Sequence, residues 1–203
     1  MVWIEERLLR KKKTIFETSL KNKEKDKKHT EGEARVLTLV FADLSGFTAM
    51  SKSLEPEEVR DVANFCFERL NAAILKQGGT IYKYEGDLVI ALFGLPTIHE
   101  DDPERAVKAA LMMMEYLPEI NKSLNSKFKI KNKLGLHIGI NSGTVYVGEI
   151  GSKEKREYTV MGDVVNFAAR LKDISPRVNI LASESTYRLT RYLFDYELLE
   201  PLA

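Results

Sequence analysis

A hydrophobic strand that ends in one aspartate constrains this chain more than any other stretch. Val36 to Thr48 reads VLTLVFADLSGFT, and its first seven residues have the pattern of a strand buried on both faces. Asp43 then stands at the exposed end of the strand, and Ser45-Gly46 opens a short helix. A carboxylate there suits a hard cation, and the backbone N–H groups after it suit a phosphate. The alternative is that this stretch is a simple helix cap.

Composition favours one globular domain. The chain has 203 residues, of which 44% are hydrophobic and 30% are charged, enough for one sizeable core. No apolar run approaches the roughly 20 residues of a membrane span, and the first residues lack the pattern of a secretory signal. Cys66 is the single cysteine and lies among apolar residues, so we expect it in the core of a cytoplasmic protein.

Basic residues are concentrated at the start of the chain. Residues 1–30 hold ten Lys or Arg against five acidic residues, whereas the formal net charge of the whole chain is +1. We therefore expect residues 1–32 to be a basic linker or signalling helix and residues 33–203 to be the functional domain. Contact of this segment with a membrane surface or an anionic partner is the alternative. The core lacks aromatic residues interleaved with base-reading side chains, which argues against nucleic acid.

Hydrophobic periodicity and turn residues predict the remaining elements. They are a helix from Pro56 to about Lys76, strands at 80–84 and 88–93, a helix after Asp102, strands at 134–140 and 144–149 around a turn at Asn141-Ser142-Gly143, and an extended arm at 148–158. A helix from Gly162 to about Lys172, a strand at 178–181, a helix at 184–190 and a last strand at 193–199 follow. This order predicts an α+β fold, with an antiparallel-rich, ferredoxin-like sheet and helices on one face.

Three further features concern the site. Asp87 directly precedes the apolar strand LVIALF, so it is a second carboxylate at a strand end. Asn166 and Arg170 are four residues apart and share one face of their helix. The acidic stretch His99 to Asp102 is followed by Pro103, and we interpret it as a helix start with Asp102 as the cap, with metal binding as the less favoured alternative.

Three motifs together resemble a known family. FADLSGFT, then KYEGD before an apolar strand, then YTVMGDVVNFAAR are similar to the catalytic domain of class III nucleotidyl cyclases, over roughly Glu33 to Ala203. The resemblance implies a core like the palm of polymerases and the formation of cyclic AMP or cyclic GMP from a nucleoside triphosphate. It also implies two divalent cations, Mg²⁺ or Mn²⁺, held by Asp43, Asp87 and the main chain of Leu44. The backbone groups of Leu44, Ser45, Gly46 and Phe47 would cradle the phosphates.

The resemblance also implies roles for four other side chains. Lys83 matches the base-reading lysine of adenylyl cyclases, and Thr159 matches the second base reader, as in bacterial and soluble, bicarbonate-responsive members. A lysine donor favours adenine because adenine N1 accepts a hydrogen bond, and a threonine hydroxyl can accept one from the adenine amino group. Asn166 matches the residue that orients the ribose, and Arg170 matches the one that stabilises the reacting phosphoryl group.

Family members build each active site across a two-fold dimer, and this chain carries both halves of the set. The resemblance therefore implies a homodimer with two equivalent sites that uses ATP, together with an upstream regulatory element. The family usually continues past Leu199 with a strand whose lysine holds the triphosphate, and that lysine has no counterpart here. A non-catalytic module with the cyclase fold is the rival hypothesis, and a guanylate cyclase is a further one.

Overall fold

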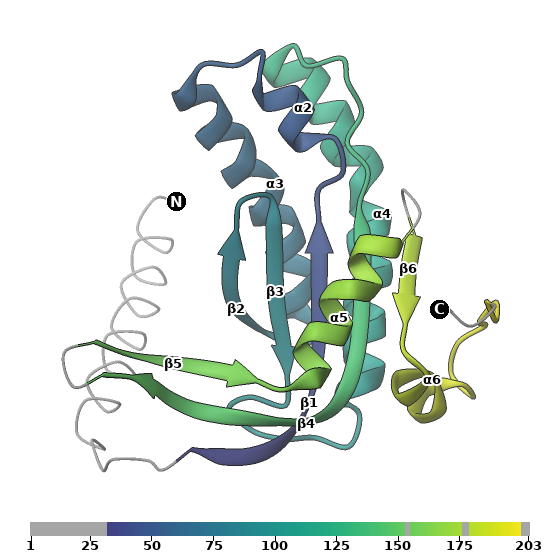
Figure 1. Cartoon of the computed structure of the whole chain (residues 1–203). Helices are drawn as coiled ribbons and strands as arrows, with labels where there is room; N and C mark the ends of the chain where they lie inside the picture. Colours follow the sequence, from purple (N-terminus) through teal and green to yellow (C-terminus); the bar gives the residue numbers. More distant parts are fainter. Residues whose placement is uncertain (1–31, 153–154, 176–178, 200–203) are drawn as a thin grey trace, which may run out of the picture. The chain divides into compact units, whose positions relative to one another are not determined.

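The computed structural model describes residues 32–152, 155–175 and 179–199 (Figure 1). The basic segment at residues 1–30 lies outside these ranges. The chain divides into two compact units, of which the larger comprises Ala34–Val147 and Val160–Ala203 and the smaller includes Gly148–Thr159. None of the helices in the described ranges combines the length and hydrophobicity that a membrane crossing requires.

The sheet places β1 at its centre. Its strand order is β2-β3-β1-β4-β5, and β6 pairs with β4. The strands are β1 (Glu33–Asp43), β2 (Thr80–Glu85), β3 (Leu88–Phe93), β4 (His137–Gly151), β5 (Arg156–Met161) and β6 (Asn179–Ala182). β3 pairs antiparallel with both β1 and β2, whereas β6 runs parallel to β4. The predicted antiparallel-rich α+β fold is therefore confirmed.

Two long helices cover one face of this sheet. α3 (Pro56–Lys76) follows the five-residue α2 (Phe47–Ser51), and α4 (Asp102–Phe128) follows β3. α3 begins as its sequence predicts, with a proline in the first turn and a capping box between Glu55 and Glu58. The apolar sides of both helices pack on the sheet in the main core, where Cys66 is fully buried. The predicted position of this cysteine in the core is confirmed.

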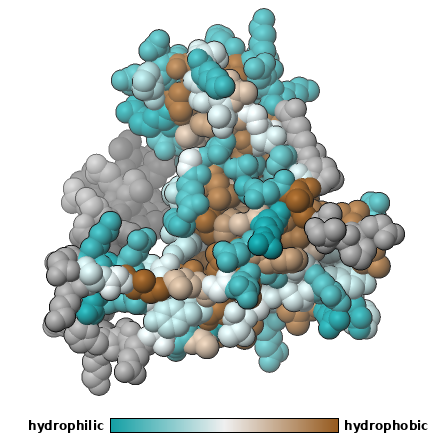
Figure 2. Space-filling model, in the orientation of Figure 1, coloured by the Kyte–Doolittle hydropathy of each residue, from teal (hydrophilic) through white to brown (hydrophobic). Residues whose placement is uncertain are grey.

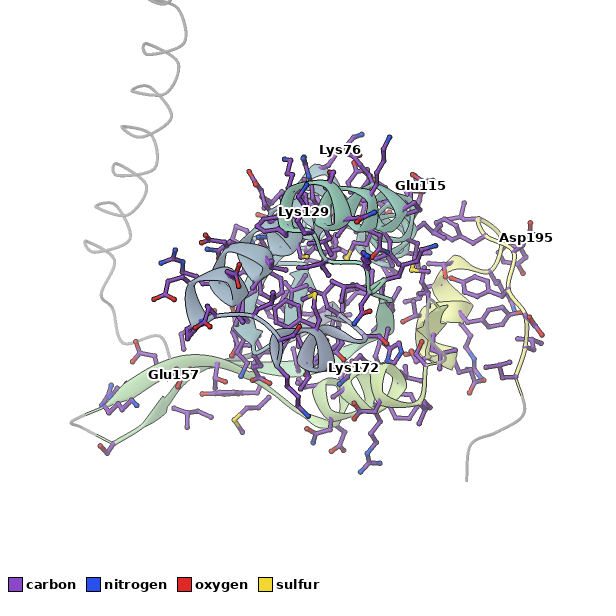
Figure 3. The ribbon with its side chains drawn as sticks, turned by 90° about the horizontal axis from the view of Figure 1, so that it is seen from above. Lys76, Glu115, Lys129, Glu157, Lys172 and Asp195 are labelled. Atoms are coloured by element: carbon purple, nitrogen blue, oxygen red, sulfur yellow. The ribbon has the colours of Figure 1, made fainter. Side chains whose placement is uncertain are left out.

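A shorter helix covers the opposite face. α5 (Asp163–Ile174) packs its Ala168 against strand residues such as Leu39 and Phe41, in a second core cluster. Figure 3 shows this arrangement from above, with Lys172 of α5 on one side of the sheet and Glu115 of α4 on the other. Our prediction of helices on one face was therefore wrong. The apolar side of α5 consists of alanines and valines, and it packs on the face of the sheet that α3 and α4 leave uncovered.

Three boundaries also differ from prediction. Asn141-Ser142-Gly143 is not a turn between two strands but the interior of β4. Residues 193–199 form no strand, and the described chain there continues irregularly after α6 (Glu184–Thr190). Asp101 rather than Asp102 is the cap residue of α4, and Asp102 instead accepts a 2.7 Å hydrogen bond from the main-chain N–H of His99.

Candidate active site

Main-chain hydrogen bonds bring Asp43 and Asp87 to the same edge of the sheet. Asp43 is the last residue of β1 and lies opposite Leu88, the residue after Asp87. The N–H of Leu44 donates a 3.1 Å hydrogen bond to the carbonyl oxygen of Asp87. The side chain of Asp87 accepts a 3.1 Å hydrogen bond from the hydroxyl of Thr48. Two residues 44 positions apart thus lie side by side because of strand pairing.

The two carboxylates repel each other. Burial raises the pKa of Asp43 above its usual value, and the negative charge of Asp87 raises it further. Electrostatic interactions with Lys172 and His137 lower this pKa in part. Such a pair of anions with incomplete charge compensation is an arrangement that a cation stabilises.

The ammonium of Lys172, in the last turn of α5, is a positive charge that acts on Asp43. The Lys172 side chain is only 16% exposed, and its ammonium lies 2.5 Å from a carboxylate oxygen of Asp173. Burial alone would lower the pKa of Lys172, but the hydrogen bond to Asp173 and the surrounding carboxylates outweigh burial and raise it. Sequence reasoning missed this residue, because a lysine near a helix C-terminus is ordinarily a favourable partner of the helix dipole.

The donor set fits Mg²⁺ or Mn²⁺. In the described ranges no group of three or more His, Cys, Asp or Glu side chains converges as a metal cage. Mg²⁺ is usually held by one or two carboxylates together with waters and substrate phosphates, so a pair of aspartates suffices. Asp43 and Asp87 are the residues that would hold the ions.

Only two of the four residues that were predicted to cradle the phosphates have a main-chain N–H group open to a ligand. The N–H groups of Leu44 and Phe47 are engaged within the loop, donating to the carbonyl oxygens of Asp87 and Leu44 at 3.1 Å each. The N–H groups of Ser45 and Gly46 donate to no acceptor among the described residues. Gly46 has a φ of 89°, a left-handed conformation that favours glycine. These two amides are the ones open to a ligand.

Lys83 lies on β2 just before the turn that holds Asp87. It is exposed, and its ammonium pairs with the carboxylate of Glu85. It also lies 5.8 Å from the ring centre of Tyr82. An ammonium has three N–H donors, so the pairing with Glu85 leaves donors of Lys83 that could contact a base. Thr159 is half-buried on β5 and belongs to the smaller compact unit.

Asn166 and Arg170 lie on the solvent side of α5, as their spacing predicted. Both are exposed, and the Arg170 guanidinium forms no hydrogen bond or ion pair with any residue in the described ranges. Both line a pocket of about 460 Å³ between α5, β4 and the start of α6. Arg170 is not among the charges that act on Asp43. The pocket also contains Asn141, which sequence reasoning had placed in a turn.

Comparison with known proteins shows the family to which the chain belongs. A sequence model of the family described as "Adenylate and Guanylate cyclase catalytic domain" matches residues 29–201. An adenylate cyclase from Anabaena cylindrica is 34% identical over 158 residues, which are 76% of this chain and 30% of that protein. The crystal structure of the adenylyl cyclase CyaB from P. aeruginosa is similar at a TM-score of 0.76 and 33% identity, covering 80% of this chain and 84% of that one.

The structure of the guanylyl cyclase Cya2 is similar at a TM-score of 0.72 and 37% identity, covering 78% of this chain and 79% of that one. The chain belongs to the adenylate and guanylate cyclase catalytic domain family. It spans about a third of the length of the Anabaena cylindrica relative. Proteins named as adenylyl cyclases and as guanylyl cyclases are thus both similar to this chain.

Proposed function

We propose that this chain is an adenylate cyclase that converts ATP to 3′,5′-cyclic AMP and pyrophosphate at sites shared between two copies. The observation that carries the proposal is the separation of the two halves of the site. Asp43 and Asp87 form an anionic pair at one sheet edge, whereas the exposed Arg170 makes no contact with that pair. A second copy, related by a two-fold axis, would supply Arg170 to the aspartates of the first.

Apolar side chains on the exposed side of α5 support this assembly. Phe167 is 46% exposed, as is Ile174 at the end of the helix, and Met161 just before the helix is 47% exposed. Figure 2 shows hydrophobic surface in the middle of the face on which α5 lies. Exposed apolar surface of this kind marks an interaction site, and a second copy is the partner that also completes the reaction groups.

Each residue of the site has a definite task in the reaction. Two divalent cations, when bound, activate the ribose 3′-hydroxyl and stabilise the leaving pyrophosphate. Asp43 and Asp87 hold the cations, and the N–H groups of Ser45 and Gly46 donate to phosphate oxygens. Arg170 stabilises negative charge that develops at the α-phosphate while the 3′-oxygen bonds to phosphorus and the bond to pyrophosphate breaks.

Two side chains select the base of the nucleotide, and a third orients its ribose. The Lys83 ammonium donates to adenine N1, which guanine does not offer as an acceptor, and the Thr159 hydroxyl accepts from the adenine amino group. The Asn166 amide orients the ribose. The rival hypotheses are a guanylate cyclase, to which the similarity with Cya2 gives weight, and a non-catalytic module. A non-catalytic module is not expected to retain both aspartates and Arg170.

Product formation by this chain tests the proposal. Purified protein is incubated with Mn²⁺ and either ATP or GTP over a range of protein concentrations, beside an Asp43→Ala control. We expect cyclic AMP whose rate per milligram rises with protein concentration and which the control does not make. Cyclic GMP as the main product would favour the guanylate cyclase, and absence of both product and nucleotide binding would favour the non-catalytic module.

A further inference from the structure

One face of β4 allows α5 to approach the sheet unusually closely. Gly139, Asn141 and Gly143 alternate along the strand and therefore lie on the same face. A Cβ at Gly139 would lie 2.4 Å from the carbonyl oxygen of Ala168, and a Cβ at Gly143 would lie 2.8 Å from Cγ2 of Val164. The two glycines thus let the helix rest on the strand, and Asn141 is the side chain between them.

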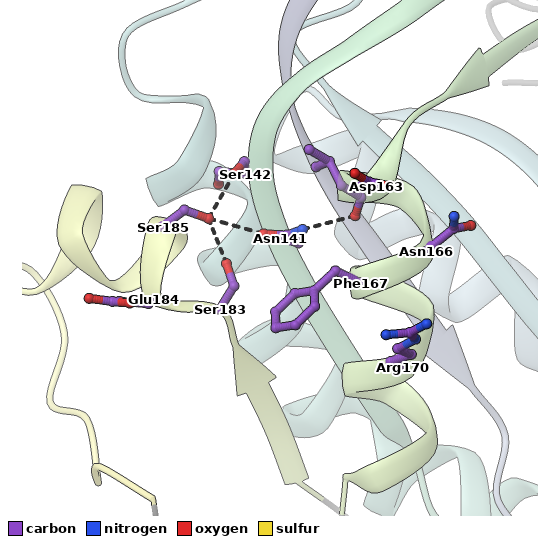
Figure 4. Close-up of a pocket in the computed structure, with 10 residues that line it drawn as sticks. Asn141, Ser142, Asp163, Asn166, Phe167, Arg170, Ser183, Glu184 and Ser185 are labelled. Atoms are coloured by element: carbon purple, nitrogen blue, oxygen red, sulfur yellow. Dashed lines mark hydrogen bonds between the residues drawn. The ribbon is translucent and has the colours of Figure 1, made fainter. Parts of the chain in front are cut away.

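Asn141 uses both ends of its amide to join two helices. Its side chain is buried, with a residue exposure of 5%. Nδ2 donates a 2.9 Å hydrogen bond to the carbonyl oxygen of Val164, in the first turn of α5. Oδ1 accepts a 3.0 Å hydrogen bond from the hydroxyl of Ser185, in the first turn of α6. Figure 4 shows both bonds at the wall of the pocket that Asn166 and Arg170 line.

The bond to Asn141 links the start of α5 to the strand but does not cap the helix, because Asn141 donates to the carbonyl oxygen of Val164 rather than accepting a bond from a first-turn N–H. Gly162 is the N-cap residue of α5 and provides no side-chain hydrogen bond to the first turn. The bond from Asn141 to Val164 is made by a side chain outside the helix and fixes the rotation of the first turn about the helix axis. Asn166 lies two residues after Val164, so this rotation decides where the Asn166 amide points.

We propose that Asn141 is a positioning residue that acts through Asn166. This proposal rests on the proposed function, in which Asn166 orients the ribose. Loss of the Asn141 amide leaves the overall fold and the exposed substrate contacts in place but lets the first turn of α5 shift. A displacement of about 1 Å at a reacting centre can cost on the order of a hundredfold in rate, so kcat rather than KM carries the effect.

Matched variants separate the two ends of the amide. We expect Asn141→Ala and Asn141→Asp to lower kcat by about tenfold or more with KM for ATP within about threefold, because both lose the donor to Val164. Ser185→Ala keeps that donor, and we expect kcat within about threefold of wild type. Thr190→Val removes a buried hydroxyl of α6 that donates a 2.8 Å hydrogen bond to the carbonyl oxygen of Thr186. This variant is the control for a general loss of stability.

A double variant tests whether the effect passes through Asn166. We expect Asn141→Ala to lower kcat less than about twofold when added to Asn166→Ala, because the residue that it positions is already gone. The same fractional loss of kcat in both backgrounds would overturn the proposal. A loss in Thr190→Val as large as that in Asn141→Ala would also overturn it.

Hydrogen exchange supplies a readout that does not need activity. We expect amide exchange in residues 163–168 to be faster in Asn141→Ala than in wild type and unchanged in Thr190→Val. Unchanged exchange in Asn141→Ala overturns the positioning role. A wild-type protein that makes no cyclic nucleotide contradicts the proposed function instead, and the exchange result still decides whether Asn141 holds the helix.

Discussion

The main-chain N–H of Leu44 donates a 3.1 Å hydrogen bond to the carbonyl oxygen of Asp87. This bond lies between the end of β1 and the turn before β3, and neither the Asp43 nor the Asp87 carboxylate takes part in it. The carboxylate of either aspartate can therefore be replaced without removing the contact that brings the two strand ends together. We therefore expect the proposed metal binding to be separable from folding at this site.

Asp87→Asn should abolish metal binding while the protein stays folded. The main-chain bond remains and the repulsion of Asp43 is removed, so we expect the free energy of unfolding to fall by no more than about 0.5 kcal/mol relative to wild type. We expect Mn²⁺ binding, followed by electron paramagnetic resonance, to be lost and kcat to fall by about a hundredfold or more. Asp61→Asn on the exposed side of α3 is the matched control. Tight Mn²⁺ binding by Asp87→Asn would contradict the metal assignment.

The stability of the metal-free protein should depend on Asp43. Because burial and the charge of Asp87 raise its pKa in the folded state, the folded chain holds a proton to higher pH than the unfolded chain. The free energy of unfolding therefore falls as pH rises from below 3.8 through the raised pKa. Asp43→Asn removes this pH-dependent loss of stability, so its free energy of unfolding should exceed that of wild type at pH 7 in EDTA. Urea unfolding across this pH range measures the difference, and equal pH profiles would contradict it.

Mixing two inactive variants should restore activity. Asp87→Asn lacks the metal half of the site and Arg170→Ala lacks the phosphate half. In a mixed dimer one site receives both substitutions and the other receives neither, so an equimolar mixture should reach about a quarter of the wild-type rate. The assay is cyclic AMP formation after the proteins exchange subunits. No recovery in a mixture shown to contain mixed dimers would place both halves in one chain.

Base preference should follow Lys83 and Thr159. Lys83→Glu together with Thr159→Cys replaces a donor to adenine N1 with an acceptor, and we expect the ratio of kcat/KM for ATP over GTP to fall by about tenfold or more. Glu85→Gln weakens the ion pair of Lys83 and should leave the preference for ATP intact. Unchanged ATP preference in the double variant would contradict the assignment of these base readers.

Cys66 should be inert in the folded protein. Burial raises the pKa of its thiol to about 12, so almost no thiolate exists at pH 8, and the side chain is fully buried. We expect no reaction with a thiol reagent such as 5,5′-dithiobis(2-nitrobenzoate) in buffer and one equivalent in urea. Rapid labelling of the folded chain would show that α3 opens readily.

Sequence patterns predicted the strands that carry the aspartates because these strands are fully apolar and end at turns. β3 is buried along its whole length, and β1 is buried over most of it. The proximity of Asp43 to Asp87, which follows from the pairing of Asp43 with Leu88, needed the structure or the family resemblance, because strand register is a long-range property. The roles of the site residues remain predictions that the experiments above test.

Asn141-Ser142-Gly143 was misread for a physical reason. These residue types favour turns because their side chains bond to nearby backbone and glycine accepts unusual conformations. Here the Asn141 amide bonds to helices instead, and Gly143 is a place for Val164 to pack. The prediction of a strand at 193–199 was wrong. Apolar residues favour a strand, but a strand also needs a neighbouring strand with which to pair.

A substitution at Gly139 would disturb the site without contacting Asn166 or Arg170. A single added methyl group there would lie 2.4 Å from the carbonyl oxygen of Ala168 and 2.6 Å from the main-chain nitrogen of Lys172. The smallest possible side chain at this position therefore displaces the helix that carries Asn166 and Arg170, although it touches neither. We therefore expect a substitution at this glycine, in the interior of a strand, to lower the reaction rate although the position is remote from the substrate.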